Sequence, residues 1–198
     1  MESLFARLAL LPEGWRENVR IGLAADGTIA DVETGSEAVA DEGVGILMPG
    51  FSNVHSHAFQ RALAGRAEVA GDSDDSFWTW RDLMYRLADR LTPKDLTSIS
   101  RLLYVEMLEA GYTAVGEFHY LHHDPAGELY EEPIAMSLAL AHAAAEAGIS
   151  LALLPVLYRY SDFGARPPEP AQRRFSTTPE QFVAMVHRLR DRLDDCIV

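Results

Sequence analysis

The first 45 residues show the alternation of hydrophobic and polar positions that predicts β-strands. Apolar side chains alternate with polar or small ones from Val19 to Leu23. Asp26-Gly27 follows as a typical hairpin turn, and residues 28–32 return as the next strand. The pattern predicts a small β-structure over residues 1–45, separate from the rest of the chain.

From residue 46 onward, apolar runs of strand length alternate with patterns of helical period. Helices are expected where a capping residue precedes apolar positions spaced three and four apart. They run from Ser76 or Asp75 through Leu91, from Thr92-Pro93 to Gly111, from Pro133 to Gly148 and from Thr178 through Leu193. Strands are expected over residues 46–57, 113–120 and 149–157, and Cys196-Ile-Val198 resembles the start of a fourth.

The strands and helices repeat as βα units. Glu109-Ala-Gly-Tyr-Thr113 and Glu146-Ala-Gly-Ile-Ser150 share one pattern of helix end, glycine and strand start. The strand at 149–157 is almost continuously apolar, which indicates burial on both faces, as in a parallel sheet. Two α/β architectures fit, an open doubly wound sheet and a (β/α)8 barrel.

The absence of a G-x-G-x-x-G after the first strand removes the dinucleotide-binding version of the open sheet. A barrel needs roughly 250 residues, so this chain would hold its first half. The pattern of the last three residues predicts the start of a further strand, which favours the barrel. We therefore predict an α/β fold, the N-terminal part of a (β/α)8 TIM-type barrel over residues 46–198, preceded by a small β-sandwich segment over residues 1–45.

Composition narrows the possible partners. The chain has 198 residues, is 48% hydrophobic and carries a formal net charge of −13. Without a basic stripe it cannot release the counterions of a phosphate backbone, so nucleic acid is excluded as a partner. No run approaches the ~20 apolar residues of a membrane span, and no signal peptide is recognisable. The single Cys196 permits no internal disulfide, so we expect a cytoplasmic protein without a membrane partner.

Two histidines stand out at the end of the first long strand. Residues two apart in a strand share a face, so His55 and His57 should aim their rings into one space. Imidazole is a common ligand of Zn²⁺, and active sites of barrels lie at the C-terminal ends of the strands. A His-x-His pair is by itself a weak signal, and two hydrogen-bonded histidines are the alternative. The position directly after an apolar strand favours metal ligation.

The surrounding residues resemble a known superfamily. Pro49-Gly50 followed by Asn53-x-His55-x-His57 resembles the first-strand motif of the amidohydrolase superfamily. Longer stretches resemble the iminohydrolases within it, namely His55-Ser-His-Ala-Phe-Gln-Arg-Ala62, Asp75-Ser-Phe-Trp-Thr-Trp-Arg81, Leu83-Met-Tyr-Arg86 and residues 111–124. The resemblance implies a (β/α)8 barrel beside a small β-sandwich, with one divalent metal, expected to be zinc, held in part by His55 and His57.

The implied reaction is metal-dependent hydrolysis of a linear amidine that carries two carboxylates, with release of ammonia. In the superfamily a third histidine, an aspartate and the catalytic carboxylate and histidine come from later strands. The catalytic residues are therefore expected outside this chain, which alone should be inactive. The expected partner is a small-molecule dicarboxylate, and a homodimer is a further expectation with no residue assigned to its interface.

Three residues are candidates for contact with the substrate. The resemblance implies that Gln60 and Tyr120 contact a substrate carboxylate. Arg81 offers the fork geometry that suits carboxylates. The structural alternatives are an exposed loop glutamine, a tyrosine at the edge of the core and an arginine paired with a nearby acid.

Other conspicuous residues are given structural interpretations. The spacing of Phe77, Trp78 and Trp80 is typical of helix packing, and a wall around a substrate pocket is the alternative. Glu117 lies in mid-strand, where a carboxylate needs a partner, so we expect a buried structural role. Arg173-Arg174 is interpreted as a solvated basic pair, with attraction of an anionic substrate as the alternative.

Two other functions remain open. The chain could belong to an aminohydrolase that acts on a ring, of the guanine or triazine type, whose substrate lacks two carboxylates. It could also be a non-catalytic barrel fragment, which metal content would distinguish from an enzyme.

Overall fold

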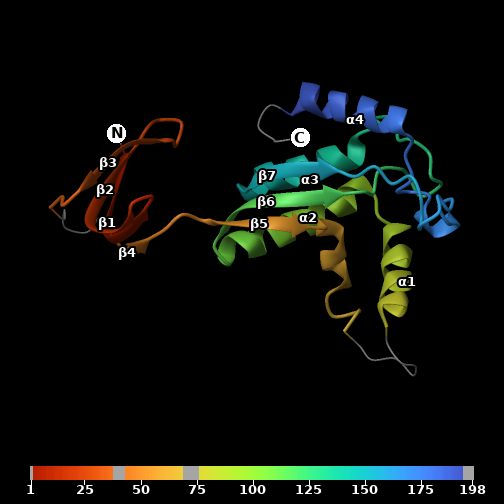
Figure 1. Cartoon of the computed structure of the whole chain (residues 1–198), viewed down its shortest axis with the longest axis horizontal. Coiled ribbons are helices and arrows are strands. Elements are labelled where there is room, and N and C mark those ends of the chain that lie inside the picture. The colour runs from red at the N-terminus through yellow and green to blue at the C-terminus, as the bar shows by residue number, and fades with distance from the viewer. Residues whose placement is uncertain (1, 38–42, 69–75, 194–198) are drawn as a thin grey trace. The chain divides into compact units, whose positions relative to one another are not determined.

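The structure, a computed structural model, describes residues 2–37, 43–68 and 76–193 (Figure 1). The chain divides into two compact units, Met1–Gly50 and Phe51–Val198. Asp75, Cys196 and the expected fourth strand lie outside the described residues.

The first unit is a four-stranded sheet in the order β3-β2-β1-β4. Its strands are β1 (Glu2–Leu11), β2 (Gly14–Leu23), β3 (Ile29–Thr34) and β4 (Val44–Leu47). The predicted hairpin is confirmed, because β2 and β3 pair antiparallel and Gly27 adopts a φ of 82° in the turn between them. Ala6, Ala9, Val19 and Ile21 form its small core.

The predicted strand over residues 46–57 is wrong, because the chain forms two strands there. Strand β4 pairs parallel with β1, whereas β5 (Phe51–Ser56) begins the sheet of the second unit. Met48-Pro49-Gly50 separates them. Proline has no N–H for a sheet ladder, and the apolar residues on both sides conceal this break from a hydrophobicity pattern. The compact units accordingly divide after Gly50, whereas the sequence pattern placed the boundary after residue 45.

The second unit contains a parallel sheet in the order β5-β6-β7. Its further elements are η1 (Ala58–Leu63), α1 (Phe77–Ala88), α2 (Pro93–Glu109), β6 (Tyr112–His119), α3 (Ala135–Ala147), β7 (Ser150–Pro155), η2 (Pro170–Gln172) and α4 (Pro179–Arg192). None of the helices in the described segments is long and apolar enough to cross a membrane.

Helices α2 and α3 connect the strands and pack against each other beside the sheet (Figure 1). Val115, Leu151 and Leu153 from the strands share one buried core with Tyr104 of α2 and Leu140 of α3. Helices on one face of consecutive parallel strands are the arrangement of a barrel wall, whereas an open doubly wound sheet has helices on both faces.

The capping signals of the sequence are confirmed at most helix ends. The side chains of Ser76, Thr92 and Thr178 cap α1, α2 and α4, and each is part of a capping box. Gly148 ends α3 with a φ of 82°, the left-handed conformation that favours glycine. The main difference lies in α1, which ends at Ala88 rather than continuing to Leu91.

Candidate active site

The two histidines reach a common face through an irregularity in β5. Asn53 pairs with Val115 and Ser56 with Glu117, so three steps along β5 match two along β6. Asn53 faces the helices, since its amide contacts the sulfur of Met107 in α2. Strict alternation would therefore turn His55 to the helices as well. The extra residue turns it to the opposite face, as β-bulges next to active sites commonly do.

The rings of His55 and His57 converge. Their Nε2 atoms lie 3.2 Å apart, and the His55 ring stacks on Phe118 at 4.5 Å between centroids. Two nitrogens that bind one tetrahedral zinc at 2.0–2.1 Å would be separated by about 3.3 Å. The pair therefore has the spacing of two ligands of one ion.

The protonation of His57 also fits metal binding. Its Nδ1 lies 2.8 Å from the carbonyl oxygen of Phe118, which can only accept, so the proton resides on Nδ1. Burial lowers the pKa of His57, so the ring is neutral and its Nε2 carries a lone pair, which accepts a hydrogen bond from Nε2 of His55 over 3.2 Å. A backbone carbonyl that orients a histidine in this way is a common companion of metal ligands.

Two imidazoles do not make a complete metal site. Within the described ranges, no group of three or more His, Cys, Asp or Glu side chains is arranged to hold an ion. The two imidazoles thus fit part of the ligand set of a divalent metal.

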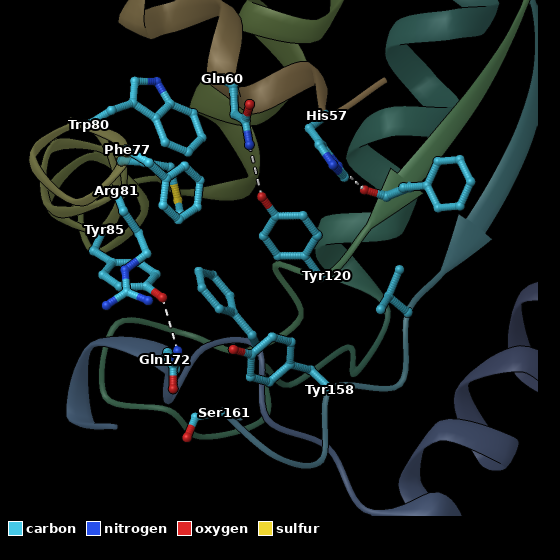
Figure 2. Close-up of a pocket in the computed structure, with 14 residues that line it drawn as sticks. His57, Gln60, Phe77, Trp80, Arg81, Tyr85, Tyr120, Tyr158, Ser161 and Gln172 are labelled. Atoms are coloured by element: carbon cyan, nitrogen blue, oxygen red, sulfur yellow. Dashed lines mark hydrogen bonds between the residues drawn. The ribbon is translucent and has the colours of Figure 1, made fainter. Parts of the chain in front are cut away.

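A cavity of about 550 Å³ opens beside His57 (Figure 2). Gln60 and Tyr120 line it next to His57, and helix α1 contributes Phe77, Trp80 and Arg81 on the other side. The structure therefore brings together three of the predicted substrate contacts and one predicted metal ligand.

Gln60 and Tyr120 act as a pair. The Nε2 of Gln60 donates to the Tyr120 hydroxyl over 2.9 Å, and the Tyr120 ring meets His57 edge-on at 4.9 Å between centroids (Figure 2). Because its oxygen accepts from Gln60, the hydroxyl can donate its own proton into the cavity. Burial raises the pKa of Tyr120 to about 12, which keeps that proton in place at neutral pH.

Arg81 is held by aromatic rings. Its guanidinium lies 4.4 Å from the ring of Trp78 and 5.6 Å from that of Tyr85. Its Nε is buried without a hydrogen-bond partner among the described residues. A cation fixed by stacking, with an unused donor, is well suited to bind an anion.

The aromatic residues of α1 do not all pack as the sequence predicted. Phe77 is 62% exposed and Trp78 is 60% exposed, while Phe77 and Trp80 line the cavity. The packing interpretation is confirmed for Trp80, which packs against the core, and is wrong for Phe77 and Trp78, because helical spacing places residues on a face but does not determine what that face meets.

The loop between β7 and α4 supplies the remaining wall of the cavity. Gln172 is buried there and donates from its Nε2 to the Tyr85 hydroxyl over 2.9 Å (Figure 2). Tyr158, Ser161 and Phe175 lie beside it. No motif marks these residues, so sequence reasoning missed them; the only signal was the length of their loop.

The two members of the basic pair differ: Arg173 is half-exposed and pairs with Asp89 over 3.1 Å, whereas Arg174 is not solvated. Its side chain is fully buried and donates to the carbonyl oxygens of His123 and Leu91, each over 2.8 Å, and to that of Ala88. The Tyr130 hydroxyl is a fourth contact, at 3.1 Å. Arg174 thus joins the end of α1 to the loops behind the cavity, and it neither faces solvent nor attracts a substrate.

Glu117 lies directly behind the histidines. It is 2% exposed, and its Oε1 accepts the backbone N–H of Ala58 over 2.7 Å. Burial raises the pKa of Glu117 to about 7. Because Ala58 follows His57, this contact anchors the backbone next to His57, in agreement with the structural role expected from the sequence.

Fold and site together agree with sequence comparison on the class of protein. Residues 46–195 match the amidohydrolase family, and the chain belongs to that family. Residues 1–45 match a second model, the N-terminal domain of the formimidoylglutamate deiminase HutF. The formimidoylglutamate deiminase of Pseudomonas aeruginosa is 51% identical over 195 residues, which are 98% of this chain and 43% of that protein.

Solved structures confirm the α/β fold as the N-terminal part of an amidohydrolase barrel. An amidohydrolase from Brucella melitensis aligns with a TM-score of 0.94 and 46% identity, over 100% of this chain and 45% of its own. The atrazine chlorohydrolase TrzN from Arthrobacter aurescens, solved with zinc, aligns with a TM-score of 0.69 over 96% of this chain and 43% of its own, at 14% identity. The chain therefore spans less than half the length of these relatives.

Proposed function

We propose that this chain forms part of a metal-dependent iminohydrolase that converts N-formimino-L-glutamate and water to N-formyl-L-glutamate and ammonia. The observation that carries the proposal is the convergence of His57 and the Gln60–Tyr120 pair at one cavity, with Arg81 facing them (Figure 2). Identity of 51% to a formimidoylglutamate deiminase supports the choice of substrate.

His55 and His57 would hold the metal, and residues beyond this chain would complete its ligands. When bound, the ion would supply Lewis acidity, which would lower the pKa of a water molecule to near 7. Hydrolysis adds water to the formimino carbon and breaks its bond to the terminal nitrogen, which leaves as ammonia. The acid and base that move these protons are not among the residues assigned here.

The residues of this chain bind and orient the substrate. Tyr120, whose hydroxyl oxygen accepts a hydrogen bond from Gln60, donates a hydrogen bond from the same hydroxyl to one carboxylate. Arg81 pairs with the other carboxylate through its guanidinium. Phe77 and Trp80 cover the apolar part of the substrate and exclude water, which strengthens these polar contacts.

The test is metal content and ammonia release in a complete protein that contains this chain together with the later strands, and in its variants. His55→Ala and His57→Ala should each lose the bound metal together with turnover of N-formimino-L-glutamate. His187→Ala, a change on the exposed surface of α4, is the matched control and should keep both. Retained zinc with near-normal turnover in the two site variants would overturn the ligand assignment.

One feature favours a second candidate, an aminohydrolase acting on a ring. Phe77, Trp80, Tyr158 and Phe175 give the cavity an aromatic lining that could stack on a flat ring. Ammonia release from guanine compared with N-formimino-L-glutamate separates the two candidates. A protein that binds no metal and releases ammonia from neither would be the non-catalytic fragment.

A further inference from the structure

A second cavity, of about 160 Å³, lies between the segment that follows β6 and helix α4. His122, His123 and Thr177 contribute its polar wall, and Leu129 and Met185 belong to its apolar wall. None of its lining residues lines the cavity beside His57. An occupant of this second cavity would therefore be independent of the proposed hydrolysis.

The polar wall of the second cavity contains buried atoms that lack hydrogen-bond partners. His122, His123 and Thr177 are 2%, 3% and 4% exposed. The Nδ1 of His122 and the Oγ1 of Thr177 have no hydrogen-bond partner in the part of the chain that the structure describes, whereas the ring of His123 is hydrogen-bonded to the backbone of Arg174. Buried polar groups in folded proteins are almost always paired, so two unpaired groups at one cavity indicate a missing occupant.

The tautomer of His122 defines what the occupant must offer. Its Nε2 lies 3.0 Å from the carbonyl oxygen of Val156, which can only accept, so Nε2 carries the proton. Burial keeps the ring neutral by lowering its pKa to about 4. The Nδ1 is therefore a bare acceptor that needs an N–H or O–H donor. The Thr177 hydroxyl can donate to an acceptor on the same molecule.

Charge and size restrict the occupant further. The cation at the rim, Arg188, already faces the carboxylate of Glu132, whose Oε1 lies 3.0 Å from its Nε, so its charge is balanced within the protein and does not require a charged ligand. The volume equals about five water molecules at ~30 Å³ each, and the apolar wall gives those waters few partners. A compact neutral molecule with an apolar body fills the space better.

We propose that this cavity is a second binding site, which takes a small neutral amide or heterocycle with one N–H donor and an adjacent acceptor. The donor bonds to Nδ1 of His122, the acceptor takes the Thr177 hydroxyl, and the apolar body packs on Leu129 and Met185. A cyclic amide such as 2-pyrrolidinone has this combination of groups, whereas cyclopentanone has the same ring size and carbonyl but no N–H.

The experiment is an NMR titration of the Met185 methyl group, assigned with Met185→Leu. We expect 2-pyrrolidinone to shift this signal with half-saturation at roughly 1 mM, which is typical of such a small ligand. Cyclopentanone should reach half-saturation only at a concentration at least about tenfold higher, because the loss of one good hydrogen bond weakens binding by about that factor.

Two variants on α4 localise the effect. Ala184 lines the cavity, so Ala184→Phe should fill it and abolish the shift. Val183 is 51% exposed and does not line the cavity, so Val183→Phe should keep the shift. The proposal is overturned if 2-pyrrolidinone causes no shift, if cyclopentanone acts equally well, or if the response persists in Ala184→Phe. A crystal structure with ordered waters only, at saturating 2-pyrrolidinone, would also overturn it.

Discussion

The buried ring of His122 should make the protein sensitive to mild acid. Burial, its largest cause, lowers the pKa of His122 from 6.5 to about 4. Above pH 6.5 the ring is neutral in both the folded and the unfolded chain, and it contributes nothing to pH dependence. Between pH 6.5 and 4 the unfolded chain takes up a proton that the folded protein does not bind, so the free energy of unfolding falls as the pH falls.

The size of this effect follows from the shift. One pKa unit corresponds to about 1.4 kcal/mol, so the lowered pKa of His122 should remove about 3 kcal/mol of stability between pH 6.5 and 4. The substitution His122→Gln tests this, because a glutamine amide can still donate to the carbonyl of Val156 but does not titrate. His119 and His123, whose pKa values are also lowered by burial, remain in both proteins.

Urea unfolding followed by circular dichroism at pH 7 and pH 4 measures the difference. We expect His122→Gln to be less stable than the parent at pH 7, because it packs less well, and to gain about 3 kcal/mol relative to the parent at pH 4. His187→Gln, on the exposed surface of α4, should show no such relative change. A stability difference between His122→Gln and the parent that stays constant within about 1 kcal/mol would refute the reasoning.

Two further predictions concern the cavity and its support. Gln60→Ala and Tyr120→Phe should each raise KM for N-formimino-L-glutamate about tenfold, because each loses one hydrogen bond to a carboxylate. The metal content of both variants should stay at the parent level. Unchanged kinetics in both variants would remove this pair from the site. Arg174→Met should lower the free energy of unfolding by about 3 kcal/mol or more, because it leaves three backbone carbonyls without their donor. Arg166→Met, at an exposed position, should change it by less than about 0.5 kcal/mol, and equal effects of the two changes in urea unfolding would contradict the role given to Arg174.

Local signals in the sequence were sufficient for most helices and for the type of sheet. The capping residues Ser76, Thr92 and Thr178 and the terminal Gly148 act through hydrogen bonds or backbone conformation within one turn of the helix. Such interactions depend only on near neighbours in the chain, so a pattern of a few residues can reveal them.

The wall of the cavity that is formed by the loop between β7 and α4 shows where local sequence patterns stop being informative. Gln172 reaches the cavity through a contact with Tyr85, 87 residues away in the chain. Arg174 binds carbonyl groups from two other segments. Neither role leaves a periodic signal, because it depends on which loops meet after the sheet and helices have packed.

The sequence by itself determined that strands alternate with helices and that two histidines follow an apolar strand two residues apart. Only the tertiary structure decided that β4 and β5 belong to different sheets and that the register shift in β5 turns His55 away from the helices. The period of a strand fixes which residues share a face, but the face that meets the core is set by the register against β6. That register depends on pairing between residues about 60 positions apart, such as Ser56 with Glu117, which no local pattern contains.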